Sequence, residues 1–517
     1  MADINDFINR DSNSVTWNTN GLPTHRDYST YVHQWKFLIR SYLGGAQFKK
    51  GQYLTRYIYE TESEYLARLD QSPLDNHCKS VIHIYNSFLY RNNPERDFGS
   101  LTGTPEIENF LKDADMEGRT FESVMRDINI YSSIYGNCWA LVDRPETQAG
   151  TRADELQQGI RPYLNIFTPE NVLDWKYMRQ PNGHYELEMI KFLEQDERPN
   201  QAASEYFVRT WTKAEITVES YNPTKKEVLQ LIDSRPNMLG KVPAVCVYAN
   251  RGPIRGIGVS DINDIAQAQR FLFELYSEAE QLVRLTNHPT LVKTNSTQAA
   301  SGAGAIITMP EELDPNLKPY ILQPDGGNLS AILETIRETI KSIDRMAHMG
   351  AIRAIETRQM SGVAMQSEFL LLDAKLCEKA KQLELAEEQI FRLFASWQGE
   401  PFDGEIKYPM AFHIRDKNLD IDILKKAADT NPADPRVKAA IDQKIMDLLS
   451  DNEEDYNEMM AHPTTTTADR SAHIQQMIMD GYTDQEILKI HPEISPADIA
   501  AAKQQLLNTT NDAAPST

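Results

Sequence analysis

Apolar side chains recur at helical spacing in three stretches of the first quarter of the chain. The first stretch, residues 28–42, places on one face Tyr31, Trp35, Leu38, Ile39 and Tyr42. The glycine pair Gly44-Gly45 predicts the end of that helix. Residues 62–91, interrupted at Pro73, and residues 120–136 repeat the pattern. We expect a flexible, polar N-terminal arm over residues 1–24 and then helices.

The pattern changes to short, partly alternating runs between Cys138 and about Tyr248. Such runs are typical of strands. The predicted strands are Trp139–Val142, Tyr206–Trp211, Ile216–Tyr221 and Val228–Ile232. The last two are joined by a hairpin turn at Asn222–Lys225. A β-rich region after a helical one predicts an α+β fold that is mostly helical.

Three longer helical patterns follow, at residues 260–285, 329–349 and 363–397. Asn328 is the predicted N-cap of the second helix. The first two are separated by residues 288–327, which contain the strand-like runs Thr290–Val292 and Ile306–Met309. Only a short segment, residues 350–362, separates the second from the third.

The third helix carries an apolar residue at every seventh position, namely Phe369, Leu376, Leu383, Ile390 and Trp397. This stripe predicts either a helix that lies on the core of its own chain or one that packs against neighbours in an assembly. Lys379 and Glu387 interrupt the stripe, which argues against a simple two-stranded coiled coil.

The last hundred residues predict short helices with clear boundaries. Asp434-Pro435 is typical of a helix start, residues 483–486 form a capping box, and Ser495-Pro496 begins a final helix. Residues 441–517 hold 14 acidic and 4 basic side chains. We expect the end of the chain, residues 508–517, to be frayed.

Charge and composition exclude several classes of protein. The 517 residues include 53 basic and 75 acidic side chains, a net charge of −22, which disfavours tight nonspecific binding to nucleic acid. No apolar run is long enough for a membrane span, and the polar N-terminus lacks signal-peptide features. We therefore expect a protein of cytosolic origin that does not enter a membrane. The four scattered cysteines predict reduced thiols.

No enzyme motif is recognisable. The glycine-rich run at residues 252–258 lacks the order of a nucleotide-binding loop and predicts a turn into a helix. The neighbours His77 and Cys78 make a weak nucleophile pair, and the acidic clusters at 416–422 and 451–455 lack the ligand order of a calcium loop. We expect no enzyme, cofactor or metal. An enzyme that uses scattered carboxylates stays open as an alternative.

Four basic side chains bracket the segment at residues 350–362, namely Lys341, Arg345, Arg353 and Arg358. They are either solvated charges, offset by Asp344 and Glu356, or the lining of a DNA path.

The order of these elements, with five local strings, resembles the portal (head–tail connector) proteins of tailed bacteriophages. The strings are YLGGAQFKKGQYLTRYIYETESEYLARL at residues 42–69, YGNCWALVDRP at 135–145, RPYLNIFTPENVLDW at 161–175, GKVPAVCVYANRG at 240–252 and SGVAMQSEFL at 361–370. Family-like positions within them are Gly44, Gly45, Asp143, Trp175, Ser361, Gly362 and Ala364. The resemblance covers about residues 28–400, and the C-terminal hundred residues match nothing in the family.

The resemblance implies a portal fold divided as follows: flexible arm 1–24, wing 25–259, first stem helix 260–287, clip 288–327, second stem helix 328–349, tunnel loop 350–362, long wing helix and return strand 363–417, crown helices 418–507 and disordered tail 508–517. In the virion it implies a ring of about twelve copies at one capsid vertex, through which double-stranded DNA is packaged and ejected. Implied partners are the terminase packaging motor, the major capsid and scaffolding proteins, and a neck or tail adaptor. The alternative is another virion protein, such as a neck adaptor or a minor capsid or scaffold component.

Overall fold

The computed structural model divides the chain into two units, residues 1–414 and 415–517. It describes residues 22–145, 154, 158–196, 205–221, 230–287, 290–294, 308, 314, 318–322, 327–350, 362–410, 412 and 503. The predicted arm before residue 22 and the predicted crown helices and tail lie outside the described residues, apart from Lys503. The description below concerns the first unit.

The described N-terminal part of this unit, from residue 22 on, contains six α-helices: α2 (Tyr28–Leu43), α3 (Gly45–Lys50), α4 (Glu62–Gln71), α5 (His77–Leu89), α6 (Pro105–Lys112) and α7 (Phe121–Tyr135). The three predicted helical stretches are confirmed. Gly44 ends α2 with φ +67°, a conformation that favours glycine, and a Cβ there would lie 2.4 Å from the Asn76 side chain. The chain turns at this glycine and continues at once as α3, which the sequence pattern did not predict.

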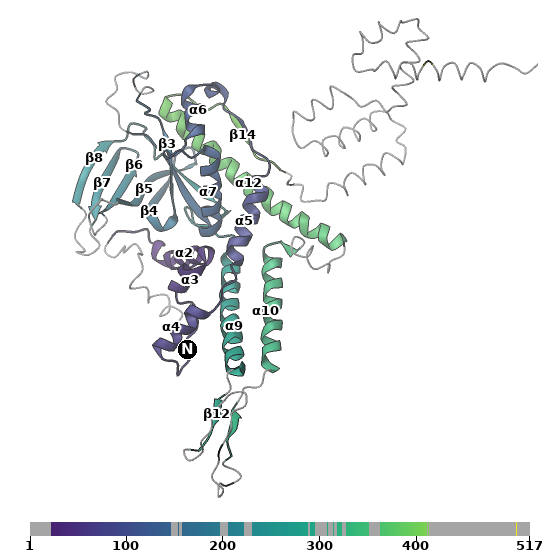
Figure 1. The fold of residues 1–517 in the computed structure, drawn as a ribbon. Coiled ribbons are helices and arrows are strands. Elements are labelled where there is room, and N and C mark those ends of the chain that lie inside the picture. Colours follow the sequence, from purple (N-terminus) through teal and green to yellow (C-terminus); the bar gives the residue numbers. More distant parts are fainter. Residues whose placement is uncertain are drawn as a thin grey trace, which may run out of the picture. The chain divides into compact units, whose positions relative to one another are not determined.

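The β-rich middle region is also confirmed, as two antiparallel sheets (Figure 1). In the smaller sheet, β2 (Asn137–Asp143) lies between β3 (Tyr163–Phe167) and β9 (Ala244–Tyr248). The larger sheet is a meander of β4 (Val172–Arg179), β5 (Tyr185–Asp196), β6 (Glu205–Thr212), β7 (Glu215–Tyr221) and β8 (Gln230–Pro236). All seven residues of β2 are buried, which fits a strand covered on both faces. The predicted strand at residues 228–232 begins at Gln230, and the predicted turn before it lies outside the described residues.

Two long helices run side by side and carry a small β-ribbon at one end (Figure 1). They are α9 (Asn263–Asn287) and α10 (Gly327–Met346), and the ribbon pairs β12 (Thr290–Val292) with β13 (Tyr320–Leu322). Of the predicted strand at 306–309, only Thr308 is described, in an isolated bridge, whereas β13 was not predicted. The predicted N-cap is wrong: α10 already begins at Gly327, so Asn328 lies in its first turn.

The longest helix, α12 (Gly362–Gln398), confirms the predicted third pattern. It packs against β2 and β9 and then leads to β14 (Glu405–Lys407), which pairs with β1 (Glu95–Asp97) as the expected return strand. The described residues of this unit also form two short 3-10 helices, η1 (Gly99–Leu101) and η2 (Pro169–Asn171), and the ribbon of β10 (Asn250–Arg251) with β11 (Gly258–Val259). None of the helices in the described part of the chain has both the length and the apolar character needed to cross a membrane.

Candidate functional site

The hairpin of α9 and α10 exposes apolar side chains along part of its length. At the end nearest α5, Ile343 is fully buried and the Tyr85 hydroxyl donates to the Ala347 carbonyl at 2.7 Å. Toward the ribbon, Leu333 of α10 is 41% exposed and Val283 of α9 is 40% exposed. The hairpin therefore leaves these apolar side chains partly exposed toward the ribbon.

The placed side chains of the ribbon are not part of the buried core. Among the described residues between 290 and 322 whose side chains can be placed, none is buried, and Tyr320 at the start of β13 is 57% exposed. A segment that projects beyond its own core without burying apolar surface gains little stability from its own chain. The placed side chains of the ribbon therefore add little to the stability of this fold.

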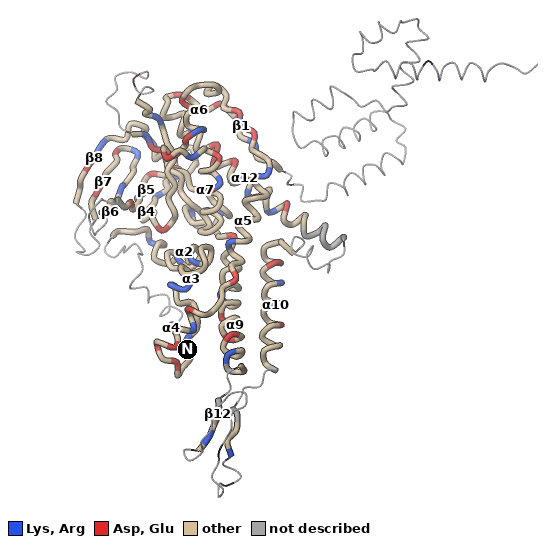
Figure 2. Tube along the Cα trace, viewed as in Figure 1, with Lys and Arg blue, Asp and Glu red and all other residues tan. Residues whose placement is uncertain are grey.

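Both acidic and basic side chains lie along α9 and α10, as Figure 2 shows. Lys341 is 61% exposed, and its Nζ lies 2.7 Å from Oε1 of Glu338. Arg284 and Arg337 likewise have a glutamate within one turn, Glu280 and Glu334 respectively. Because each of these cations faces a carboxylate, the hairpin attracts phosphate only weakly.

The structure leaves part of the predicted DNA-facing set without description. Arg345 is exposed near the end of α10. Arg353, Arg358 and Ser361 lie outside the described residues, as does the side chain of Ala364 in the first turn of α12, the helix that begins at Gly362. The prediction that the four basic residues line a DNA path therefore stays a prediction, because two of them lie outside the described residues.

The chain leaves α10 through a left-handed turn at a residue other than glycine. His348 has φ +53°, and the Met349 N–H reaches back to the Asp344 carbonyl at 2.9 Å. This bond closes the end of the helix in the manner of a Schellman turn, which normally uses glycine. The direction in which the chain enters segment 350–362 is thus fixed by backbone hydrogen bonds.

The first charged residue in the stripe of α12 is part of a buried ion pair. Lys379 is only 2% exposed, and its Nζ lies 2.6 Å from Oδ2 of Asp261 and 2.7 Å from Oγ of Ser133. Lys375 approaches the same carboxylate at 3.3 Å. Burial alone would raise the pKa of Asp261, but the two ammonium groups lower it to about 2. This cluster ties the long helix to the segment that leads into α9.

The second charged residue of the stripe, Glu387, is fully buried and also has partners within the chain. Its carboxylate forms an ion pair with Arg96 of β1 and accepts a hydrogen bond from the Tyr408 hydroxyl at 2.6 Å. Burial raises the pKa of Tyr408 well above its ordinary value, so this hydroxyl stays a donor. Since both charges in the stripe have partners within the chain, the prediction that α12 lies on its own core is confirmed.

Two family-like residues have clear structural roles. Asp143 is buried at the end of β2, where Oδ2 accepts bonds from the Tyr163 hydroxyl and from Arg209 Nη1, each at 3.2 Å. Burial raises the pKa of Asp143, an effect that the Arg144 N–H and Arg209 offset only in part. Trp175 is also buried, and its indole N–H donates to the Arg255 carbonyl at 2.8 Å.

The glycine-rich run at residues 252–258 forms the turn between β10 and β11. Gly256 has φ +87°, and a Cβ at this position would lie 2.2 Å from Nε1 of Trp175. Its N–H donates to the Tyr248 hydroxyl at 2.7 Å. Close packing and a left-handed backbone account for a glycine here without a phosphate ligand.

The described residues offer no recognisable catalytic centre. Burial strongly raises the pKa of the Cys78 thiol, which keeps it from forming the reactive thiolate. Its neighbour His77 is buried, with Nε2 3.1 Å from Oδ2 of Asp75. Among the described residues, no three His, Cys, Asp or Glu side chains are placed to hold a metal ion. The acidic clusters at 416–422 and 451–455 lie outside them.

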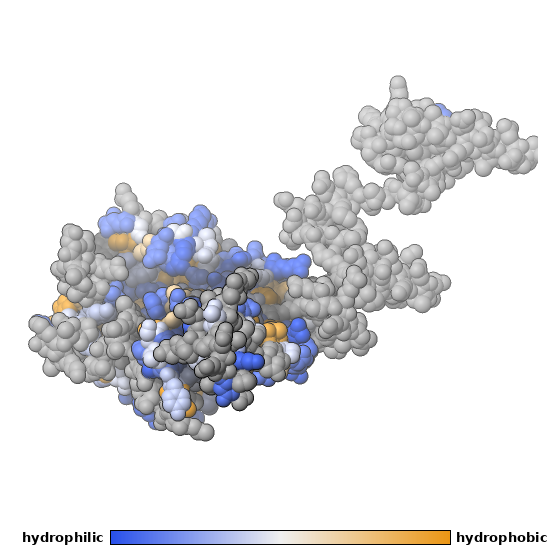
Figure 3. Space-filling model, turned by 60° about the horizontal axis from the view of Figure 1, so that its bottom comes forward, coloured by the Kyte–Doolittle hydropathy of each residue, from blue (hydrophilic) through white to orange (hydrophobic). Residues whose placement is uncertain are grey.

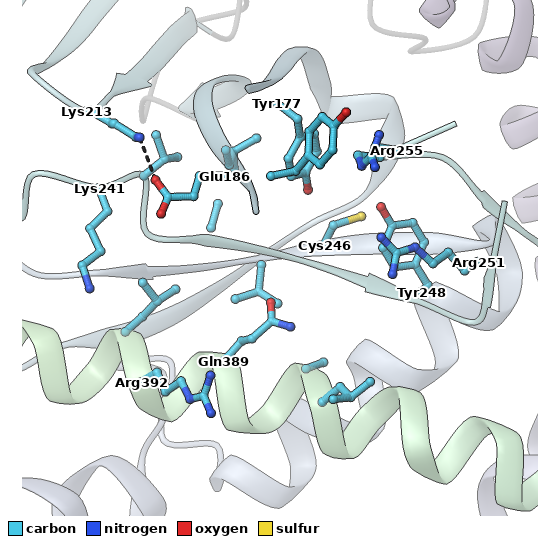
Figure 4. A pocket seen from close by; sticks show the side chains of 18 of the residues that line it. Tyr177, Glu186, Lys213, Lys241, Cys246, Tyr248, Arg251, Arg255, Gln389 and Arg392 are labelled. Atoms are coloured by element: carbon cyan, nitrogen blue, oxygen red, sulfur yellow. Dashed lines mark hydrogen bonds and ion pairs between the residues drawn. The ribbon is translucent and has the colours of Figure 1, made fainter. Parts of the chain in front are cut away.

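A basic cavity of about 660 Å³ lies between β5, β9 and α12, and no sequence motif indicated it (Figure 4). We call it the basic cavity. It is lined by Tyr177, Tyr185, Lys213, Lys241, Arg251, Arg255, Leu385 and Arg392, together with neighbouring apolar and polar residues. The Arg255 guanidinium lies 3.6 Å from the centre of the Tyr185 ring, and Lys213 pairs with Glu186 and Glu188. These residues come from separate stretches of the sequence, so their proximity depends on the fold.

No protein-family model matches this chain, and no curated protein matches it. Among solved structures, it is similar to a chain from the virion of a native gene transfer agent particle, with a TM-score of 0.38 and 9% identity over 81% of this chain and 94% of that one. It is also similar to a chain from the neck of an empty gene transfer agent particle, with a TM-score of 0.37 and 8% identity over 72% of this chain and 90% of that one. Both scores are too low to assign the fold to a family.

Proposed function

We propose that this chain is a portal subunit: a non-enzymatic component of a ring at one capsid vertex through which double-stranded DNA is packaged and ejected. The ring docks the packaging motor and later the neck and tail proteins. The observation that carries the proposal is the projecting hairpin. The long helices α9 and α10 expose apolar side chains, and the ribbon at their end projects beyond the core. A short segment then leads to α12, which a buried ion pair joins to the rest of its own chain.

The charges of the chain favour a protein through which DNA passes and disfavour a protein that binds DNA tightly. The net charge of −22 per chain repels DNA, and a ring of about twelve copies would carry roughly −260 formal charges. Cations on α9 and α10 are offset by carboxylates one turn away. DNA can therefore move past such a surface, because these paired cations hold phosphate only weakly.

A packaging reaction that assembles particles with and without the chain tests this function. We expect capsids assembled without the chain to hold no nuclease-protected DNA, because DNA has no entry vertex. Capsids that fill with DNA but fail to gain tails would instead indicate a neck adaptor and contradict the proposal.

The same reaction tests the path along the stem. The double variant Lys341→Glu with Arg345→Glu is expected to assemble normally, since exposed substitutions change stability by less than about 0.5 kcal/mol. It should package several-fold less DNA, because the added carboxylates increase repulsion of phosphate. A control is Lys112→Glu with Lys407→Glu, which replaces two exposed lysines that, like Lys341, each face a nearby glutamate. Equal losses in the two double variants would show that the stem position has no special role.

A further inference from the structure

The two most exposed large apolar side chains of the described residues are adjacent in the sequence. Ile58 is 92% exposed and Tyr59 is 96% exposed, at the tip of the loop between α3 and α4. We call residues 55–60 the tip loop. On the face seen in Figure 3, hydrophobic surface appears as separate patches among hydrophilic ones. Two neighbouring apolar side chains in full contact with water suggest a surface that becomes covered on assembly.

The backbone below this tip is held by one buried arginine. Arg68 of α4 is 3% exposed, and its guanidinium donates to both carboxylate oxygens of Glu60 at 2.7 Å and to the Thr55 carbonyl at 2.8 Å. The same guanidinium lies 4.0 Å from the centre of the Tyr57 ring. One side chain therefore fixes both ends of the tip loop.

Further bonds attach the tip loop to α9. The Tyr57 hydroxyl donates to Oε1 of Glu278 at 2.6 Å, and the Thr55 hydroxyl donates to Oε1 of Glu274 at 2.7 Å. Arg56 donates to the Glu60 carbonyl at 2.8 Å. A loop that is already ordered loses little conformational entropy when its tip is bound, so these contacts prepare Ile58 and Tyr59 for a partner.

The charges beside the tip are acidic. Glu62 and Glu64 follow it in the first turn of α4, and both are exposed. Glu62 pairs with Arg56, and Glu64 forms a capping box with Thr61. A complementary surface would combine an apolar cavity with cations at its rim.

The basic cavity has this combination. Its apolar lining includes Tyr177, together with Tyr185 at 47% exposure and Leu385 at 53% exposure. Arg251 and Arg255 line one side and Lys241 another (Figure 4). Its volume of about 660 Å³ is large enough to receive one or two side chains of this size.

We infer that the tip loop of one copy inserts Ile58 and Tyr59 into the basic cavity of the adjacent copy. The two surfaces differ, so the contact is heterologous, and repeated contacts of this type close into a ring when the rotation between copies closes. The inference rests on the proposed function, because the occupant it names is the neighbouring subunit.

The experiment compares the assembled mass of the full chain with that of the double variant Ile58→Ser with Tyr59→Ser. Both positions are exposed, so the fold and its melting temperature should not change. Loss of an anchoring contact should raise the dissociation constant between neighbours at least about 30-fold. The matched control is Leu231→Ser with Ile232→Ser on β8, which are adjacent, exposed and outside both surfaces.

A photoreactive benzoyl-phenylalanine in place of Tyr59 then identifies the receiving surface by mass spectrometry. Crosslinks to peptides that contain Tyr185 or Leu385 of a second copy support the inference, and crosslinks confined to another surface overturn it. Normal rings from the serine double variant also overturn it, while the proposed function stands. A wild-type chain that forms no ring under any assembly condition removes both.

Discussion

Replacing Asp261 with alanine is expected to lower the free energy of unfolding by about 3–5 kcal/mol. The side chain of Asp261 has no exposed surface, and it is the carboxylate that Lys379 and Lys375 both approach. Without it, the Lys379 ammonium stays buried beside the Ser133 hydroxyl as its remaining described partner. Breaking a buried ion pair by removing one partner costs more than the pair contributes, because a charge is left uncompensated in the interior.

Urea unfolding followed by circular dichroism measures this loss. The control is Asp264→Ala, three residues later in the first turn of α9, where the carboxylate is exposed. Removing it should change stability by at most about 1 kcal/mol. Equal urea midpoints of unfolding for the two variants would show that the buried ion pair does not stabilise the packing of α12 on the rest of the unit.

The pH dependence of stability follows from the same carboxylate. Its folded pKa of about 2 lies below the ordinary value of 3.8, so the folded state favours the ionised form. Its contribution is therefore complete above about pH 4 and is lost as the pH falls through 2. The difference in free energy of unfolding between wild type and Asp261→Ala should therefore become smaller as the pH falls from about 4 through 2.

Replacing residues 288–326 with a short flexible linker is expected to abolish ring formation and leave the rest of the chain folded. The placed side chains of the β12–β13 ribbon are not buried, so its removal should cost little stability. The assembled mass should fall from roughly 700 kDa, expected for about twelve copies of the 58.9 kDa chain, to that of a single shortened chain.

Deletion of residues 418–517 is the comparison for this variant. We expect it to reduce assembly less than removal of the ribbon, as measured by mass photometry. The reverse order would mean that the assignments of the clip to residues 288–327 and of the crown to residues 418–507 are wrong.

Long helices were predictable because their apolar positions repeat over many turns. The patterns at 28–42, 260–285 and 363–397 each appear as a helix within a few residues of the expected bounds. Short elements were not predictable, because a few residues do not define a period. Thus β13 was missed, and α6, whose two buried positions are Ile107 and Phe110, was not predicted either.

The candidate sites were harder to predict than the helices. Lys379 and Glu387 stood out in the sequence as charges within an apolar stripe, and such charges indicate buried partners. The partners, Asp261 and Arg96, are distant in the sequence, so only the fold identifies them. The basic cavity could not be predicted from the sequence for the same reason, because β5, β9 and α12 are distant in the sequence and each supplies part of its lining.

The most direct test of the portal proposal is electron microscopy of the purified full-length chain, alone and with scaffolding and capsid proteins. The proposal predicts closed rings of about twelve copies in end-on views, each with a central channel wide enough for double-stranded DNA. Single chains, or assemblies without a channel, under all of these conditions would contradict it.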